Sequence, residues 1–158
     1  MVRLTNSSQE YRDQIKRELT GQFIDWETLF SYVEMPHFLS YAYSFTFVAK
    51  GGEFRLIQKI WNAKYDNSRF NLGIYNLDRL SISEKIVPLD TNEITFLNSI
   101  DAEKLNSIEY EGIVLDGLIC ELTISGKKEY LKWNTDEEMN HELKVLVNWM
   151  RSKTNRER

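Results

Sequence analysis

The sequence predicts an α+β domain with a mainly antiparallel sheet, built from two hairpins at about 38–61 and 113–133 and packed by N-terminal and C-terminal helices. Three observations predict this class. Two stretches rich in β-branched and aromatic residues each contain a short glycine turn, and apolar residues recur every three or four positions near both ends of the chain. With 158 residues, 42% of them hydrophobic and only two prolines, we expect one folded domain, 1–158.

The second hairpin and the helix after it carry the clearest pattern. Cys120, Leu122 and Ile124 alternate with polar residues, so we expect one buried strand face. Ser125-Gly126-Lys127 supplies a turn before the return strand 128–133. Thr135 and Glu138 then have the spacing of a capping box, which predicts that the last helix begins at about 136. Its predicted buried stripe comprises Met139, Leu143, Leu146 and Met150.

Two helices are predicted before the first hairpin. Ser7 and Glu10 form a capping-box pattern, which predicts a helix over 8–19, and Tyr11, Ile15 and Leu19 give it a narrow apolar stripe. The next segment is rich in aromatic residues and has Asp25 available as an N-cap. It predicts a second short helix that ends before Pro36, because the residue before a proline disfavours helical geometry.

The first hairpin, about 38–61, has one aromatic face and turns at Gly51-Gly52. Its aromatic row comprises Tyr41, Tyr43, Phe45 and Phe47. Such a row could stack on the bases of single-stranded nucleic acid, but those platforms are framed by many Lys and Arg residues, and here only Lys50, Arg55 and Lys59 are near. We therefore interpret the row as core packing and expect no nucleic-acid partner.

The middle of the chain is less regular. Polar, asparagine-rich segments over 63–84 predict turns around a short helix or strand. A strand over 81–87 is expected to end at Pro88. Asp90 then opens a predicted helix that carries Ile94, Leu97 and Ile100 on one side.

The sequence contains no recognisable catalytic constellation. The only histidines, His37 and His141, lie in no motif with a serine or cysteine. The single cysteine, Cys120, falls on a predicted apolar face, where a thiol is unreactive. No Cys or His pair has the spacing of metal ligands, and no glycine-rich phosphate loop occurs. We therefore expect no enzyme activity, cofactor or metal.

Net charge is −4 but is unevenly distributed. The stretch 84–121 contains nine acidic and two basic residues, a net charge of −7, whereas the residues from 144 onward carry +4. An acidic centre favours a cationic partner and argues against general DNA binding. No apolar run is long enough to span a membrane, the first residues lack the apolar core of a signal peptide, and a single cysteine suits a reducing compartment. The expected location is cytoplasmic, with no membrane partner.

The C-terminal quarter resembles the small bacterial immunity proteins that neutralise polymorphic or contact-dependent toxins. The resemblance is carried by Asp116-Gly117 before a strand, the turn at 125–127, the return strand 130–133 and a closing helix that ends at Trp149. It implies an acidic, non-catalytic, cytoplasmic inhibitor that binds one cationic toxin, commonly a nuclease, and covers its active cleft. Such families share little sequence in their binding surfaces, so no residue role is transferred.

The leading hypothesis is therefore a protein-binding inhibitor whose acids steer a basic toxin toward it. The candidate partner-binding residues are Asp90, Glu93, Asp101, Glu103, Glu109, Glu111 and Asp116. A second hypothesis is a small-molecule-binding protein or enzyme with a pocket beside the aromatic hairpin, lined by Tyr41, Tyr43, Trp61 or Trp133. A third is a subunit of an assembly that uses the apolar strip around Trp149 as an interface. The sequence leaves the oligomeric state open.

Overall fold

The computed structural model describes residues 3–69, 74–108, 118–125 and 130–154. It confirms the predicted α+β class: an open antiparallel sheet of six strands in the order β6-β4-β3-β2-β7-β8, with a separate pair β1-β5. The strands are β1 (Leu4–Thr5), β2 (Glu27–Pro36), β3 (Ala42–Lys50), β4 (Glu53–Trp61), β5 (Tyr75–Asn76), β6 (Ile82–Val87), β7 (Leu118–Ile124) and β8 (Leu131–Trp133). The helices are α1 (Ser8–Leu19), α2 (Ala63–Arg69), α3 (Thr91–Asn98) and α4 (His141–Ser152), with 3₁₀ turns η1 (Ala102–Lys104) and η2 (Asp136–Glu138).

Both predicted hairpins are present. Strands β3 and β4 pair from Ala42↔Trp61 to Lys50↔Glu53. The turn between them is Gly51-Gly52, with φ values of 56° and 85°, a left-handed conformation that favours glycine. Strands β7 and β8 pair from Cys120↔Trp133 to Leu122↔Leu131. Residues 113–117 of the predicted strand, and most of its turn, lie outside the described residues.

The prediction of a second short helix before Pro36 was wrong, because this segment forms strand β2, which ends at Pro36. This strand pairs with β3 on one edge and β7 on the other, and so joins the two hairpins at the centre of the sheet. Its two faces are both covered, so apolar residues occur at successive positions and the alternation that marks a half-exposed strand is lost. Asp25, the proposed N-cap, instead has φ 68°, in the left-handed region, in the turn that leads to the strand.

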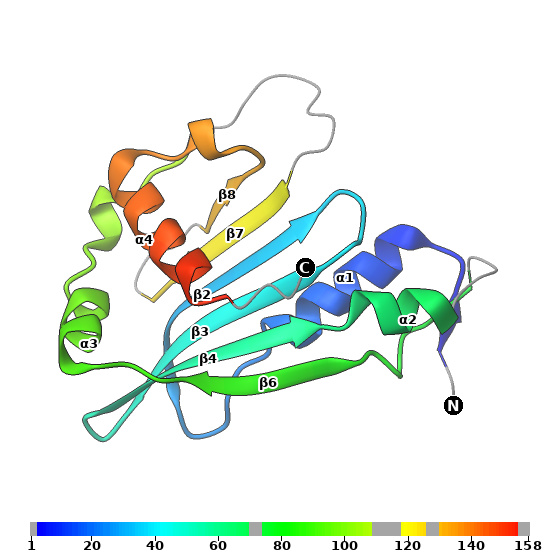
Figure 1. The fold of residues 1–158 in the computed structure, drawn as a ribbon, viewed down its shortest axis with the longest axis horizontal. Coiled ribbons are helices and arrows are strands. Elements are labelled where there is room, and N and C mark those ends of the chain that lie inside the picture. The colour runs from blue at the N-terminus through cyan, green and yellow to red at the C-terminus, as the bar shows by residue number, and fades with distance from the viewer. Residues whose placement is uncertain (1–2, 70–73, 109–117, 126–129, 155–158) are drawn as a thin grey trace.

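The two faces of the sheet support separate cores. Helix α1 packs on one face, where Tyr11, Ile15 and Leu19 contact Val33, Met35 and Trp61 among others. Helices α3 and α4 cover the other face, toward the opposite end of the molecule (Figure 1). The aromatic row belongs to this second core: Tyr43, Phe45 and Phe47 are buried, which confirms the core-packing interpretation. Cys120 and Leu122 are buried in it as predicted.

Helices α1 and α4 each begin directly after a residue whose side chain caps the helix, but α4 begins later than predicted. Helix α1 spans the predicted 8–19, and the Ser7 side chain accepts a hydrogen bond from the backbone N–H of Glu10 at 3.2 Å. Helix α4 does not begin at the Thr135–Glu138 pattern, which forms only the 3₁₀ turn η2. It begins at His141, and the Asn140 side chain accepts from the backbone N–H of Leu143 at 3.0 Å.

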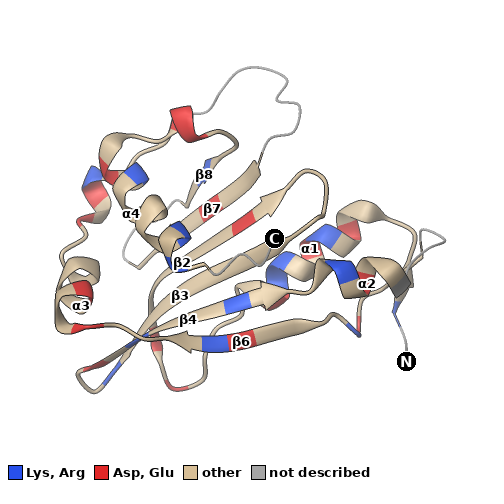
Figure 2. Ribbon diagram, viewed as in Figure 1, with Lys and Arg blue, Asp and Glu red and all other residues tan. Residues whose placement is uncertain are grey.

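Strand β6 forms one edge of the sheet and presents Glu84 and Lys85 there, both exposed (Figure 2). Charged residues on an edge discourage pairing with a further strand. Among the helices that the structure describes, none combines the length and the apolar composition needed to cross a lipid bilayer.

The Gly51-Gly52 turn makes a stability prediction. Gly52→Ala should lower the free energy of unfolding by about 1 kcal/mol, because alanine is strained at positive φ even though an added Cβ would meet no atom within 4 Å. Gly21→Ala is the matched control. The nearest atom to its added Cβ is 3.6 Å away and its φ is ordinary, so it should leave stability unchanged or raise it. Urea denaturation of the two variants checks this, and equal effects would contradict it.

Candidate functional site

A buried polar cluster lies between β2 and the C-terminal half of α4. At its centre is Glu34, which is fully buried. Tyr32 donates its hydroxyl to Glu34 Oε1 at 2.7 Å and Tyr41 donates to Oε2 at 3.0 Å. Arg151 Nε also donates to Oε1, at 2.8 Å, and its Nη1 donates to both carboxylate oxygens of Asp136 at 3.0 Å. The cluster therefore ties helix α4 and the turn η2 to the central strand.

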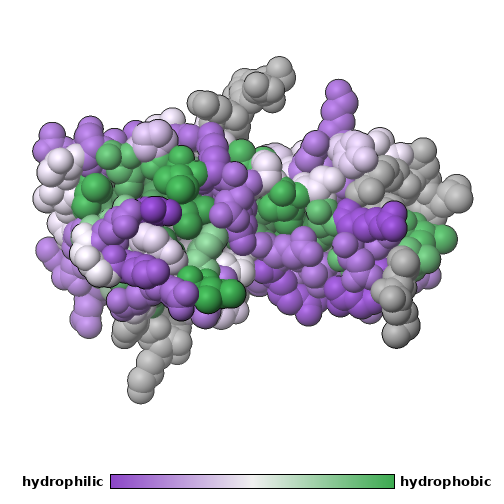
Figure 3. Space-filling view, turned by 90° about the horizontal axis from the view of Figure 1, so that it is seen from below, coloured by the Kyte–Doolittle hydropathy of each residue, from purple (hydrophilic) through white to green (hydrophobic). Residues whose placement is uncertain are grey.

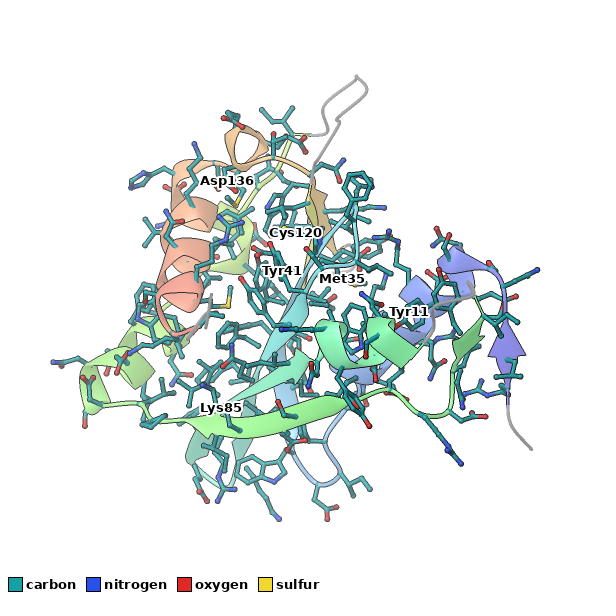
Figure 4. All side chains as sticks on the ribbon, turned by 45° about the vertical axis from the view of Figure 1, so that its right-hand side comes forward. Tyr11, Met35, Tyr41, Lys85, Cys120 and Asp136 are labelled. Carbon is teal, nitrogen blue, oxygen red and sulfur yellow. The ribbon has the colours of Figure 1, made fainter. Side chains whose placement is uncertain are left out.

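Cys120 completes this cluster, with its Sγ 3.8 Å from the Tyr32 hydroxyl. Figure 4 labels Tyr41, Cys120 and Asp136, which come from three different parts of the chain and lie near one another in that view. Burial, together with the nearby Glu34 charge, raises the pKa of the Cys120 thiol from 9.0 to about 12. Burial likewise raises the pKa of Tyr32 well above its usual value. The thiol and the phenol are therefore protonated at neutral pH, and neither is a nucleophile there.

The guanidinium of Arg151 stays charged. Burial lowers its pKa, but the neighbouring Tyr32, Glu34 and Asp136 raise it by more, so the net shift is upward. The arrangement is a compensated buried charge, which holds α4 and η2 against the central strand. The sequence pattern does not reveal this cluster, because it predicts a helix around Glu34 and marks Arg151 only as part of a basic C-terminal segment. The signal that could have found it is a lone acid within the apolar run of 29–35.

Two adjoining cavities lie near the N-terminal half of α4. The apolar pocket, about 290 Å³, is lined mainly by Leu29, Phe30, Phe47, Leu97 and Ile124. The acidic-rim pocket, about 300 Å³, has walls of Phe96, Ile100, Leu105, Val145 and Leu146 and a rim of Ser99, Asp101, Lys104, His141 and Glu142. Ile100 and Leu146 line both cavities, so they form the partition between them. In Figure 3, green hydrophobic side chains reach the surface at the end of the molecule that carries α3.

The predicted partner-binding acids have different roles in the structure. The Asp90 side chain caps α3 by accepting a hydrogen bond from the backbone N–H of Glu93 at 2.8 Å. In turn, the Glu93 side chain accepts a hydrogen bond from the backbone N–H of Asp90. Glu93 also forms an ion pair with Lys153. Asp101 caps η1, its side chain accepting from the backbone N–H of Glu103 at 3.0 Å. Within the described residues, neither Asp101 nor Glu103 has an ion-pair partner, and both are exposed.

The other three predicted acids, Glu109, Glu111 and Asp116, lie outside the described residues. The structure adds Glu142, an exposed acid that sequence analysis did not select. It lies 41 positions after Asp101 in sequence, yet both side chains line the acidic-rim pocket. No local pattern could have placed them at one pocket, because their proximity depends on how α4 packs beside η1.

The residues named in the alternative hypotheses occupy other positions. Tyr43, Trp61 and Trp133 are buried in the two cores, and neither cavity described above is lined by them. Trp149 packs against Phe96 with ring centroids 5.8 Å apart and lies 5.4 Å from Lys153 Nζ, so its ring is partly covered within the chain. His37 and His141 are exposed, and in the described part of the chain no group of three or more His, Cys, Asp or Glu residues is arranged to hold a metal.

The buried cluster predicts unequal costs for two similar substitutions. Glu34→Gln should lower the free energy of unfolding by about 2–4 kcal/mol, because Arg151 loses a fully buried counter-charge. Glu121→Gln removes a carboxylate that pairs with the partly exposed Lys16 on the other face, and it should cost less than about 1 kcal/mol. Chemical denaturation measures both. Equal and small costs would show that the Glu34–Arg151 pair does not hold α4 in place.

Cys120 predicts a pH effect. Its pKa is 9.0 in ordinary surroundings and about 12 in the folded chain, so folding favours the protonated thiol. That contribution to stability is complete below pH 9 and is lost as the pH rises toward 12. Iodoacetamide at pH 8 should therefore label Cys120 in the urea-unfolded chain and leave it unlabelled in the native chain. Between pH 9 and 11, the free energy of unfolding of the Cys120→Ala variant should fall by less than that of the unmodified chain. Rapid labelling of the native chain would contradict the burial.

Comparison with protein-family models, with curated proteins and with solved structures finds no match.

Proposed function

We propose that this chain is a non-catalytic inhibitor that binds a cationic protein, such as a toxic nuclease, and neutralises it by covering its active surface in the manner of an immunity protein. The observation that carries the proposal is the set of exposed carboxylates around the acidic-rim pocket. Asp101, Glu103 and Glu142 meet no cation in the described part of the chain, whereas buried Glu34 is fully paired. Unpaired surface acids are available to a basic partner at little desolvation cost.

The absence of an activated nucleophile in the buried cluster fits this proposal. Its thiol and phenol are protonated, and its carboxylate is held by three donors, Tyr32, Tyr41 and Arg151. We therefore propose that the chain acts on its partner through the shape and charge of its surface. Complementary charge raises the rate at which partners meet and discriminates against acidic proteins.

The proposal predicts that association is driven by charge. The variant Asp90→Asn, Glu93→Gln, Asp101→Asn, Glu103→Gln removes four charges and retains capping side chains, because asparagine caps helices as well as aspartate does. Its association rate with the partner should fall about tenfold at low salt, and the remaining rate should vary less with ionic strength. The partner is first captured from the source cell on the tagged chain and identified, and rates are then measured by surface plasmon resonance.

The control variant carries Glu10→Gln, Asp13→Asn and Glu18→Gln on α1, which packs on the opposite face of the sheet. It should associate at the unmodified rate. Inhibition is measured as loss of the captured partner's own activity on adding the chain. Capture of an acidic protein, or a partner whose activity the chain leaves unchanged, would refute the proposed function.

A further inference from the structure

The acidic-rim pocket combines an apolar interior with charged groups at its edge. Its walls are formed by Phe96, Ile100, Leu105, Val145 and Leu146. Val145, on α4, is 43% exposed, which is high for an apolar side chain. A volume of about 300 Å³ is large enough for one or two side chains of a protein partner. Hydrophobic pockets of this kind, ringed by polar groups, hold the anchor residues of protein interfaces.

The charge on the rim indicates which residues of the partner would flank the inserted side chain. Asp101 and Glu142 line the rim and Glu103 is exposed on η1 beside it, and among the described residues that line the pocket the one Lys or Arg is Lys104. These acids come from two elements, η1 and the first turn of α4, which the packing brings to one opening. The rim is therefore net negative, and it complements a cation placed next to the inserted side chain.

We propose that this pocket is the docking site for the anchor of the cationic partner, a segment with an apolar side chain flanked by Lys or Arg. The apolar side chain enters against Ile100, Val145 and Leu146, and the flanking cations pair with Asp101, Glu103 and Glu142. This inference rests on the proposed function and deepens it by assigning the recognition site and the chemistry of the recognised segment.

The probe is a synthetic ten-residue peptide that alternates Lys and Leu, compared with two matched peptides, one with Glu in place of Lys and one with Ser in place of Leu. In ¹⁵N-correlated NMR spectra, the Lys/Leu peptide should shift the amide signals of residues 96–105 and 141–147 more than those of α1. The other two peptides should bind at least about tenfold more weakly, because each lacks one half of the required chemistry.

Two variants separate apolar from charged recognition. Val145→Glu adds an acid to the rim, so recognition by charge alone would strengthen binding of the Lys/Leu peptide, whereas loss of the apolar wall should weaken it about tenfold. The variant Asp101→Asn, Glu103→Gln, Glu142→Gln should weaken binding by a similar factor. The three substitutions on α1 make the same change in net charge and should leave the affinity unchanged. Circular dichroism confirms that each variant is folded.

The outcomes distinguish this site from the proposed function. Tighter binding by Val145→Glu, equal loss in the rim and α1 variants, or signal shifts centred elsewhere would overturn the docking site, even if the captured partner is cationic and is inhibited. Conversely, the peptide pattern described above would support the pocket even if the captured partner were not inhibited, in which case only the proposed function fails.

Discussion

The central position of β2, covered on both faces, is the constraint on which the rest of the structure depends. Its edges bond to β3 and β7, so it joins the two hairpins into one sheet. Its side chains enter both cores, and the one acid it buries, Glu34, must be compensated because an unpaired carboxylate there would cost several kcal/mol. Arg151 supplies that compensation, and the ion pair fixes the C-terminal half of α4 over the sheet.

The position of α4 then shapes the surface proposed to bind a partner. Its C-terminal half lies on the buried cluster, whereas its first turn lies beside η1. Apolar side chains from α3 and α4 do not fully close the space between these elements, which leaves two cavities on either side of Ile100 and Leu146. The same packing that satisfies Glu34 therefore brings Asp101 and Glu142 to one opening.

Acidic composition alone did not distinguish structural from available acids. Asp90 and Glu93 complete the capping box of α3, and Glu93 also pairs with Lys153, so much of their charge is used within the fold. Asp101 both caps η1 and lines the acidic-rim pocket. A carboxylate that caps a short exposed turn remains accessible to a partner, because it accepts only one backbone hydrogen bond and leaves acceptor capacity free.

Local patterns in the sequence determined the α+β class, helix α1 with its Ser7 cap, the glycine turn between β3 and β4, and the buried faces of Cys120 and the aromatic row. These depend on residues close together in the chain. Only the tertiary structure decided that 27–36 is a strand, because burial on both faces removes its alternation, and that α4 begins after Asn140. The Glu34–Arg151 pair and the rim of Asp101 with Glu142 join residues 117 and 41 positions apart. Arrangements of residues so far apart in the chain are set by packing, which no local pattern encodes.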